Sequence, residues 1–172
     1  MKRFLIYIGV FVAGMVIQFS LNQFFSIAGV APNFLLVFTI FIGLMYGPVP
    51  GQLFGFIWGL SWDIMSVDLF GSHVFLLTTV GFVSGLLSKK WNEDKFSAQA
   101  VLVGLSSIFF IIGKYLLYQI FSPGEYKFTL NYIVIFQPFY NVIMAPAVFA
   151  AGLILSRVFD KVIYGEEDFK RL

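Results

Sequence analysis

Residues 32–63 read PNFLLVFTIFIGLMYGPVPGQLFGFIWGLSWD, and this stretch decides the fold class. Its first half is an apolar run without a charged residue, which is typical of a helix in a bilayer and not of an alternating strand. Glycine and proline interrupt the run at Gly47-Pro48-Val49-Pro50, which predicts a helix break. A second short apolar run follows and ends before Asp63.

Apolar runs of similar or greater length fill the rest of the chain. A helix needs roughly 20 apolar residues to cross the hydrocarbon core. We therefore predict an all-α integral membrane protein, a six-transmembrane-helix bundle that forms a single domain over residues 1–172. The short second and third segments are either two thin spans or one re-entrant hairpin. The predicted helices are Phe4–Ile27, Pro32–Tyr46, Val49–Trp62, Gly71–Ser88, Ala98–Phe121 and Ile133–Phe159.

The composition agrees with this class. The chain is 59% hydrophobic and 12% charged, and a soluble domain of this length needs more charge to cover its surface. No basic, polar segment is long enough to bind nucleic acid. Cysteine is absent, which excludes a disulfide, a thiolate nucleophile and a Cys-ligated metal.

Lysine and arginine predict the orientation. Nine of the eleven lie before the first helix, in the loop at 89–97, or at and beyond the end of the last helix, whereas Lys127 lies in an opposite loop and Lys114 within a helix. Because Lys and Arg stay on the cytoplasmic side, both ends of the chain are predicted inside. The start resembles a signal peptide, but it lacks a small-x-small cleavage site and is interpreted as an uncleaved first helix.

A glycine recurs at every fourth position through Gly47, Gly51, Gly55 and Gly59. Such a ladder leaves a smooth groove on one helix face, which lets another backbone approach closely. The groove serves either internal packing of the bundle or a partner helix, and the spacing alone does not choose.

Two charged residues are predicted to lie in the outer half of the bilayer. Asp63 follows the glycine ladder, and Lys114 lies about 24 Å along its helix at 1.5 Å per residue from Ala98. A charge at that depth is costly unless it is paired, hydrated or able to reach the interface. Three interpretations remain: Lys114 extends to the interface, it pairs with Asp63, or both residues belong to an ion or substrate pathway.

Polar amides occur in pairs on two helices. Gln18 and Asn22 share a face of the first helix, and Gln137 and Asn141 share a face of the last. Buried amides usually join helices by hydrogen bonds, with a ligand site as the alternative. His73 is the only histidine, and without supporting ligands it does not indicate a metal site, so we place it at the outer interface.

Catalytic signatures are missing from the sequence. It contains no G-x-S-x-G elbow, no phosphate-binding loop and no H-E-x-x-H motif. We therefore predict no enzyme, no catalytic residue, no metal and no cofactor.

The pattern resembles the rod shape-determining protein MreD family. The resemblance rests on Pro32-Asn33, on the glycine ladder followed by Leu60 and Asp63, on Gly71, and on Asn141 with Pro146. It implies a non-enzymatic scaffold of the bacterial elongation machinery, or elongasome, in the cytoplasmic (inner) membrane. The implied partners are MreC, and with it MreB, RodA and its penicillin-binding transpeptidase.

The same resemblance implies a fold similar to the substrate-binding subunits of energy-coupling-factor vitamin transporters. That similarity supplies the alternative function, a vitamin-binding subunit of such a transporter. A vitamin site needs convergent polar and aromatic groups in an outward-facing pocket. The outer loops here are short and poor in such groups, which favours the scaffold.

Overall fold

The computed structural model describes the backbone of residues 2–26, 30–66, 69–88, 96–123 and 132–169, and the side chains of these residues except 2–7, 21–23, 96, 132–135 and 157–169. Six helices account for the regular structure of the described residues, so the all-helical prediction is confirmed. The last helix continues past its predicted end at Phe159, since no proline interrupts it there. The helices are α1 (Lys2–Phe25), α2 (Phe34–Tyr46), α3 (Pro48–Met65), α4 (Ser72–Leu87), α5 (Phe96–Phe121) and α6 (Tyr132–Phe169).

A single residue, Gly47, separates α2 from α3. Its φ of 94° is one that L side chains rarely adopt, so glycine is required at this position. The Gly47 N–H donates to the carbonyl of Gly43, and its own carbonyl accepts from the N–H of Gly51. Pro48 begins α3, where its missing N–H costs nothing. The break between the two helices is therefore one residue narrower than the predicted bounds, because Pro48 already begins α3.

Helix α2 forms the centre of the molecule. It packs against each of the other five helices, and its residues from Phe34 to Leu44 are all buried. A helix that is apolar on every side is expected where other helices surround it.

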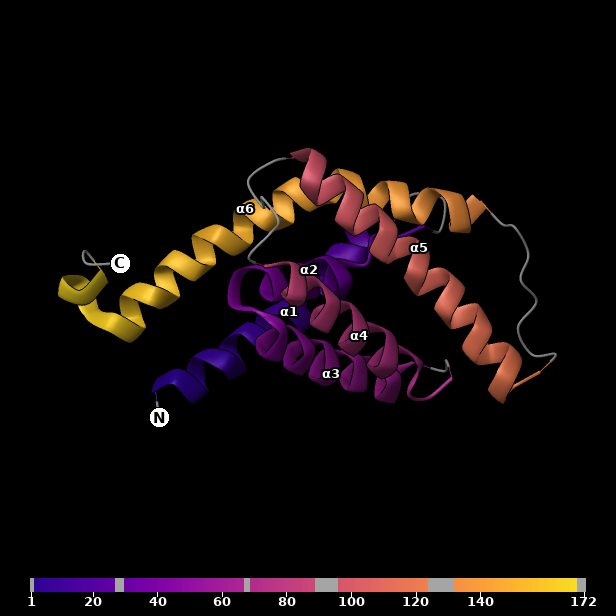
Figure 1. Ribbon diagram of the computed structural model, residues 1–172, viewed down its shortest axis with the longest axis horizontal. Helices are drawn as coiled ribbons and strands as arrows, with labels where there is room; N and C mark the ends of the chain where they lie inside the picture. The colour runs from indigo at the N-terminus through magenta and orange to yellow at the C-terminus, as the bar shows by residue number, and fades with distance from the viewer. Residues whose placement is uncertain (1, 27–29, 67–68, 89–95, 124–131, 170–172) are drawn as a thin grey trace.

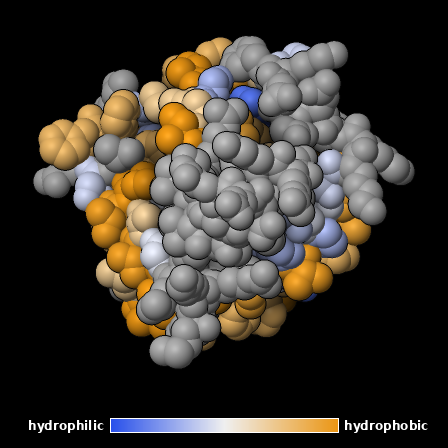
Figure 2. Space-filling view, turned by 90° about the vertical axis from the view of Figure 1, so that its left-hand side faces the viewer, coloured by the Kyte–Doolittle hydropathy of each residue, from blue (hydrophilic) through white to orange (hydrophobic). Residues whose placement is uncertain are grey.

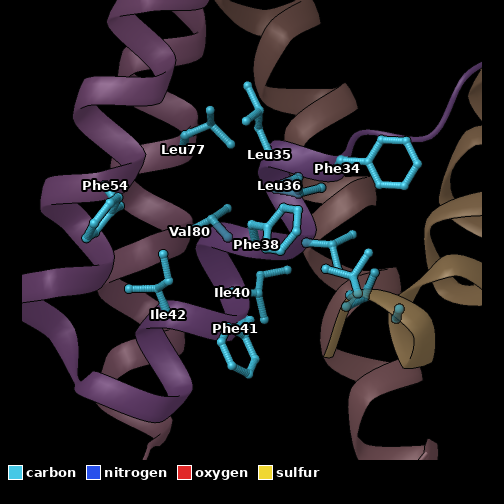
Figure 3. Close-up of a cluster of buried hydrophobic side chains, with 14 of the residues drawn as sticks. Phe34, Leu35, Leu36, Phe38, Ile40, Phe41, Ile42, Phe54, Leu77 and Val80 are labelled. Atoms are coloured by element: carbon cyan, nitrogen blue, oxygen red, sulfur yellow. The ribbon is translucent and has the colours of Figure 1, made fainter. Parts of the chain in front are cut away.

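Aromatic and aliphatic side chains from several helices fill the space around α2 (Figure 3). Phe41 of α2 meets Phe149 of α6 edge to face, with ring centroids 5.5 Å apart. On the other side, Trp58 of α3 packs against Phe38 and Phe54. These rings tie α2 to both the α3 and the α6 sides of the bundle.

Helices α2, α3 and α4 lie side by side, and α5 and α6, which pack against each other, lie along one side of this group (Figure 1). The first turns of α1 and the last turns of α6 lie at the same end of the molecule, where α6 extends beyond the other helices (Figure 1). The start of α1 and the end of α6 therefore lie on the same side of the fold.

Much of the described surface is apolar. Large hydrophobic side chains such as Phe24, Ile64 and Phe139 are 81%, 68% and 70% exposed. Figure 2 shows the molecule from the end that carries both termini. In this view, hydrophobic residues lie around much of the edge of the described surface. Within the described residues, the segments Ser97–Phe121 and Phe136–Ser156 are long and apolar enough to cross a bilayer. The shorter α2 and α4 are apolar as well.

Candidate functional site

The glycine ladder lies against α4. A Cβ atom on Gly55 would lie 2.7 Å from the carbonyl carbon of Leu77, and one on Gly59 would lie 2.6 Å from the Cα of Val74. Real Cβ atoms essentially never come that close to a backbone. The α3 and α4 backbones are therefore in direct contact along this face.

Glycines of α4 complete the same contact. Gly81 lies against the carbonyl of Gly51, and Gly85 lies against Pro48 at the start of α3. Gly47, the first residue of the predicted ladder, has no atom near its missing side chain and serves the turn instead. Within the described residues, the face that carries Gly51, Gly55 and Gly59 is already occupied by α4.

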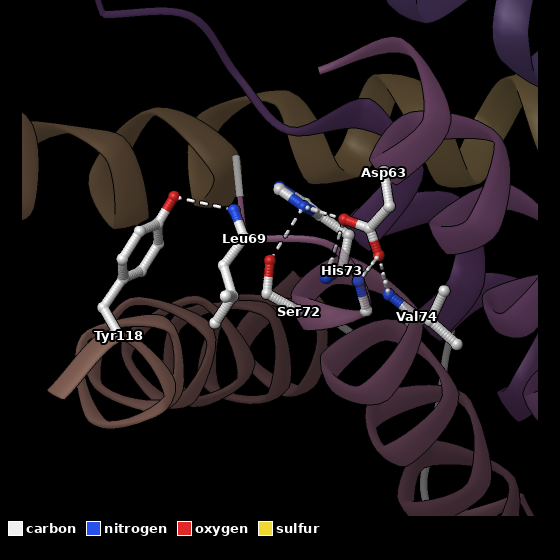
Figure 4. Close-up of polar contacts among 7 residues, drawn as sticks. Asp63, Leu69, Ser72, His73, Val74 and Tyr118 are labelled. Carbon is white, nitrogen blue, oxygen red and sulfur yellow. Dashed lines mark hydrogen bonds and ion pairs between the residues drawn. The ribbon is translucent and has the colours of Figure 1, made fainter. Parts of the chain in front are cut away.

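Asp63, near the end of α3, caps the N-terminus of α4. Gly71 precedes α4 at a φ of 90° and offers no side chain to cap it. Asp63 supplies the missing acceptor from the neighbouring helix (Figure 4). Its Oδ2 accepts from the N–H groups of Gly71 and Val74, both at 3.0 Å, and its Oδ1 accepts from the N–H of His73 at 3.2 Å. We call Asp63 and these three residues the α4 cap. A negative charge is also favoured there by the helix dipole.

His73 adds a side-chain contact to the α4 cap. Its Nδ1 lies 2.8 Å from Oδ1 of Asp63 and 3.4 Å from the hydroxyl of Ser72. The ring is enclosed by Trp62 of α3 and Phe110 of α5, with centroids 6.0 and 5.5 Å away. The His73 side chain is only 9% exposed, so the ring is buried between helices, and its position at the membrane interface stays a prediction. The turn that begins α4 directs the ring inward.

The structure gives Asp63 partners that the sequence did not indicate, while a pair with Lys114 stays a prediction. The Asp63 side chain is fully buried, and the partners that the structure gives its carboxylate are Gly71, His73 and Val74. Lys114 is half-buried on α5 and is not among them. Since the short loop after α3 returns directly to α4, His73 reaches the Asp63 carboxylate, for which the sequence had suggested Lys114 as a partner.

Tyr118 of α5 holds the same loop. Its hydroxyl accepts a hydrogen bond of 2.8 Å from the N–H of Leu69, just before α4 begins (Figure 4). Helices α3, α4 and α5 are thus joined by polar contacts at one end. Sequence reasoning did not single out Tyr118, because a tyrosine in an apolar helix gives no indication of a distant backbone partner.

A second polar cluster caps α2, and we call Gln18, Asn33 and Asn141 the α2 cap. Asn33 is the N-cap residue, and its Oδ1 accepts from the N–H of Leu36 at 3.0 Å. Gln18 of α1 accepts from the N–H of Leu35 at 3.0 Å. Asn141 of α6 accepts from the N–H of Asn33 at 2.7 Å. Amides from three segments thus satisfy the N–H groups at the start of α2.

Asn141 extends this cluster to α5. Its Nδ2 donates to the hydroxyl of Ser107 at 2.9 Å, and that hydroxyl donates to the carbonyl of Val103 at 2.7 Å. Asn141 is 1% exposed and Gln18 is 3% exposed. A buried amide without a hydrogen-bond partner would cost free energy. Because these amides are hydrogen-bonded, the network joins four helices at little net cost in free energy.

Two predicted polar residues remain, Gln137 and Asn22. Gln137 lines a cavity of about 10 Å³ beside Asn141 and Ser107. The side chain of Asn22 lies outside the described residues. The α2 cap was missed as a unit, although Asn33 directly before an apolar helical run is a recognisable N-cap signal.

The chemistry of both clusters is structural. Each acceptor is aimed at backbone N–H groups of a helix start, and Asp63, Gln18 and Asn141 are buried among apolar residues. Among the described residues, no group of three or more His, Cys, Asp or Glu side chains could hold a metal. The polar side chains of these clusters join helices.

An all-helical protein with an apolar exterior and helix-capping polar clusters is the class that the fold defines. Comparison with protein families gives the particular family. The family model described as rod shape-determining protein MreD matches residues 1–155. The chain therefore belongs to the MreD family, a membrane-associated structural family that acts in rod shape determination.

The other comparisons add no relative. Neither the curated proteins nor the solved structures give a match. The family match gives no support to the alternative of a vitamin-transporter subunit.

Proposed function

We propose that this chain is a non-enzymatic scaffold of the bacterial elongasome that binds MreC and helps to control lateral peptidoglycan synthesis. The match to the MreD family over residues 1–155 carries the proposal. By the same relationship, MreB, RodA and its penicillin-binding transpeptidase belong to the wider assembly. Both caps support a holding role, because their buried polar side chains fix helices to one another.

The proposed setting is the inner membrane, crossed six times with both ends in the cytoplasm. Nine of the eleven Lys and Arg residues fall on one side in this arrangement. The common end of α1 and α6 is consistent with it (Figure 1). Helices as short as α2 are tolerated at the centre of a bundle, because they are surrounded by protein and not by lipid.

The partner helix is expected on the outer faces of α1, α5 or α6. The ladder face is occupied by α4 and cannot receive a second backbone. By contrast, α5 exposes an apolar face along much of its length, where Val101, Leu105 and Ile112 are 52%, 62% and 49% exposed. In lipid, association depends on close packing over such faces, since the hydrophobic effect does not drive helices together.

Co-purification tests the proposal. The tagged chain is co-expressed with MreC and extracted in mild detergent, and MreC is expected to be retained. Photo-crosslinking amino acids at Val12 and Leu105 test two outer faces, and one at Phe54, which is 6% exposed, is the buried control. Recovery of the folded chain without MreC, and without cross-links from either outer position, would overturn the scaffold proposal.

A further inference from the structure

A narrow apolar groove runs between α1 and α6, with α2 and Trp58 of α3 as its floor. Its volume is about 60 Å³. Ala13 and Gly14 line one wall, Gly152 and Ser156 line the other, and Phe41 lies between them. The Ser156 hydroxyl donates back to the carbonyl of Leu153, so it presents little polarity to an occupant.

Two glycines shape the groove. A Cβ on Gly14 would lie 2.6 Å from the Trp58 ring, and a Cβ on Gly152 would lie 2.6 Å from the Phe41 ring. Glycine at both positions lets these rings lie against the helix backbones, which leaves a smooth floor. Trp58 itself is anchored, because its Nε1 donates to the carbonyl of Phe11 at 3.1 Å.

The size of the groove selects among apolar occupants. An α-helix is about 10 Å across with its side chains, far wider than this space allows. Along α1 the lining runs from Val10 to Ile17, which is about 10 Å at 1.5 Å per residue. A single aliphatic chain has the required shape.

The charges at the ends of α1 and α6 identify the rest of the occupant. Arg157 directly follows the lining residue Ser156, and Lys161 lies one turn further along α6. Lys2 and Arg3 lie at the start of α1, about 10 Å before Val10. The two helices that form the walls therefore both carry basic residues beyond the same end of the groove, and such clusters attract anionic lipid head groups.

We propose that this groove binds one acyl chain of an anionic phospholipid, whose head group lies at the basic ends of α1 and α6. The lipid is assigned to the cytoplasmic leaflet, and only this assignment rests on the orientation of the chain proposed above. It does not depend on MreC. The bound lipid fills the space between α1 and α6, which otherwise touch little.

Trp58 provides the probe, because it lies on the floor and is only 1% exposed. The full chain carrying Trp62→Phe and Trp91→Phe keeps Trp58 as its single tryptophan. It is reconstituted without partners in vesicles of phosphatidylglycerol or phosphatidylcholine whose acyl chains carry bromine, which quenches tryptophan fluorescence. We expect brominated phosphatidylglycerol to quench Trp58 at a fraction of the total lipid roughly fivefold lower than brominated phosphatidylcholine needs for the same quenching. The variant Arg157→Gln/Lys161→Gln is expected to lose this preference for the anionic lipid.

A matched pair of variants fills the groove or leaves it open. Ala13→Leu places a branched side chain in the groove and is expected to abolish the quenching, whereas Ala151→Leu makes the same change on an exposed face of α6 and retains it. Mass spectrometry checks the result without tryptophan substitutions. Phosphatidylglycerol is expected to stay bound to the unaltered protein and to be lost from Ala13→Leu. Absence of quenching overturns the lipid site, and equal quenching by both lipids overturns the anionic assignment. Since no partner is present, neither result bears on the scaffold proposal.

Discussion

Asp63 of α3 and His73 of α4 are joined twice, through the histidine ring and through its main-chain N–H. Oδ1 of Asp63 lies 2.8 Å from Nδ1 of His73 and 3.2 Å from its backbone nitrogen. The other oxygen, Oδ2, accepts from Gly71 and Val74. One buried carboxylate thus begins α4 and fixes it to the end of α3, where the glycine contact between the two helices also ends.

Removing this carboxylate should destabilise the protein. In Asp63→Ala the N–H groups of Gly71, His73 and Val74 lose their acceptor, and we expect a loss of about 2–4 kcal/mol. Asp63→Asn keeps one acceptor oxygen and should lose less. Denaturation in detergent, followed by circular dichroism, measures both. An Asp63→Ala protein as stable as the unaltered one would show that the α4 cap contributes nothing to stability.

A double-mutant cycle separates the partner of Asp63 from the one expected from the sequence. Asp63→Asn and His73→Gln should be coupled by about 1–3 kcal/mol, since the two residues are in contact. Asp63→Asn and Lys114→Gln should be additive within about 0.5 kcal/mol. Strong coupling in the second cycle would return Lys114 to the role of an ion-pair partner.

The ladder should tolerate no bulk where it faces α4. Gly55→Leu forces the α3 and α4 backbones apart, at a cost of about 1–3 kcal/mol or more. Gly9→Leu is the matched control, since Gly9 is exposed and has nothing within 4 Å of its missing side chain. The yield of monodisperse protein after detergent extraction distinguishes them. Equal yields would mean that α3 and α4 separate without penalty.

The α2 cap should be sensitive to loss of Asn141. Asn141→Leu leaves the N–H of Asn33 and the hydroxyl of Ser107 without their amide partner, and we expect about 1–3 kcal/mol of destabilisation. Ser107→Ala removes only one end of the network and should cost less. Thermal unfolding in detergent ranks the two variants, and the reverse order would contradict this account of the cap.

The orientation can be read with single cysteines, because the chain has none of its own. Cysteine at Asn92 or Glu167 should react with a membrane-impermeant maleimide only after the inner face is opened. Cysteine at Asp68 or Gly124 should react in intact cells. Labelling of position 92 from outside would invert the proposed topology.

The amino-acid sequence was enough to predict the six helices of the described residues, their approximate ends and the apolar character of their surfaces. These properties are local: an apolar run favours a helix, and Gly47 with Pro48 ends one helix and begins the next. The family could also be recognised from residues 32–71, because its pattern of glycine, proline and Asp63 lies within one short stretch. Spacing further showed that the ladder occupies one face of one helix.

The hydrogen-bond partner of each polar residue could be identified from the tertiary structure alone. Asn141 reaches the N–H of Asn33 across 108 residues, and Trp58 reaches the carbonyl of Phe11 across 47. No local pattern encodes such distances along the chain. They follow from α2 lying at the centre, where the N–H groups at its start donate to whichever buried amide oxygens the surrounding helices bring within reach. For the same reason Asp63 pairs with His73, since a buried carboxylate is stabilised by the donors that packing places beside it.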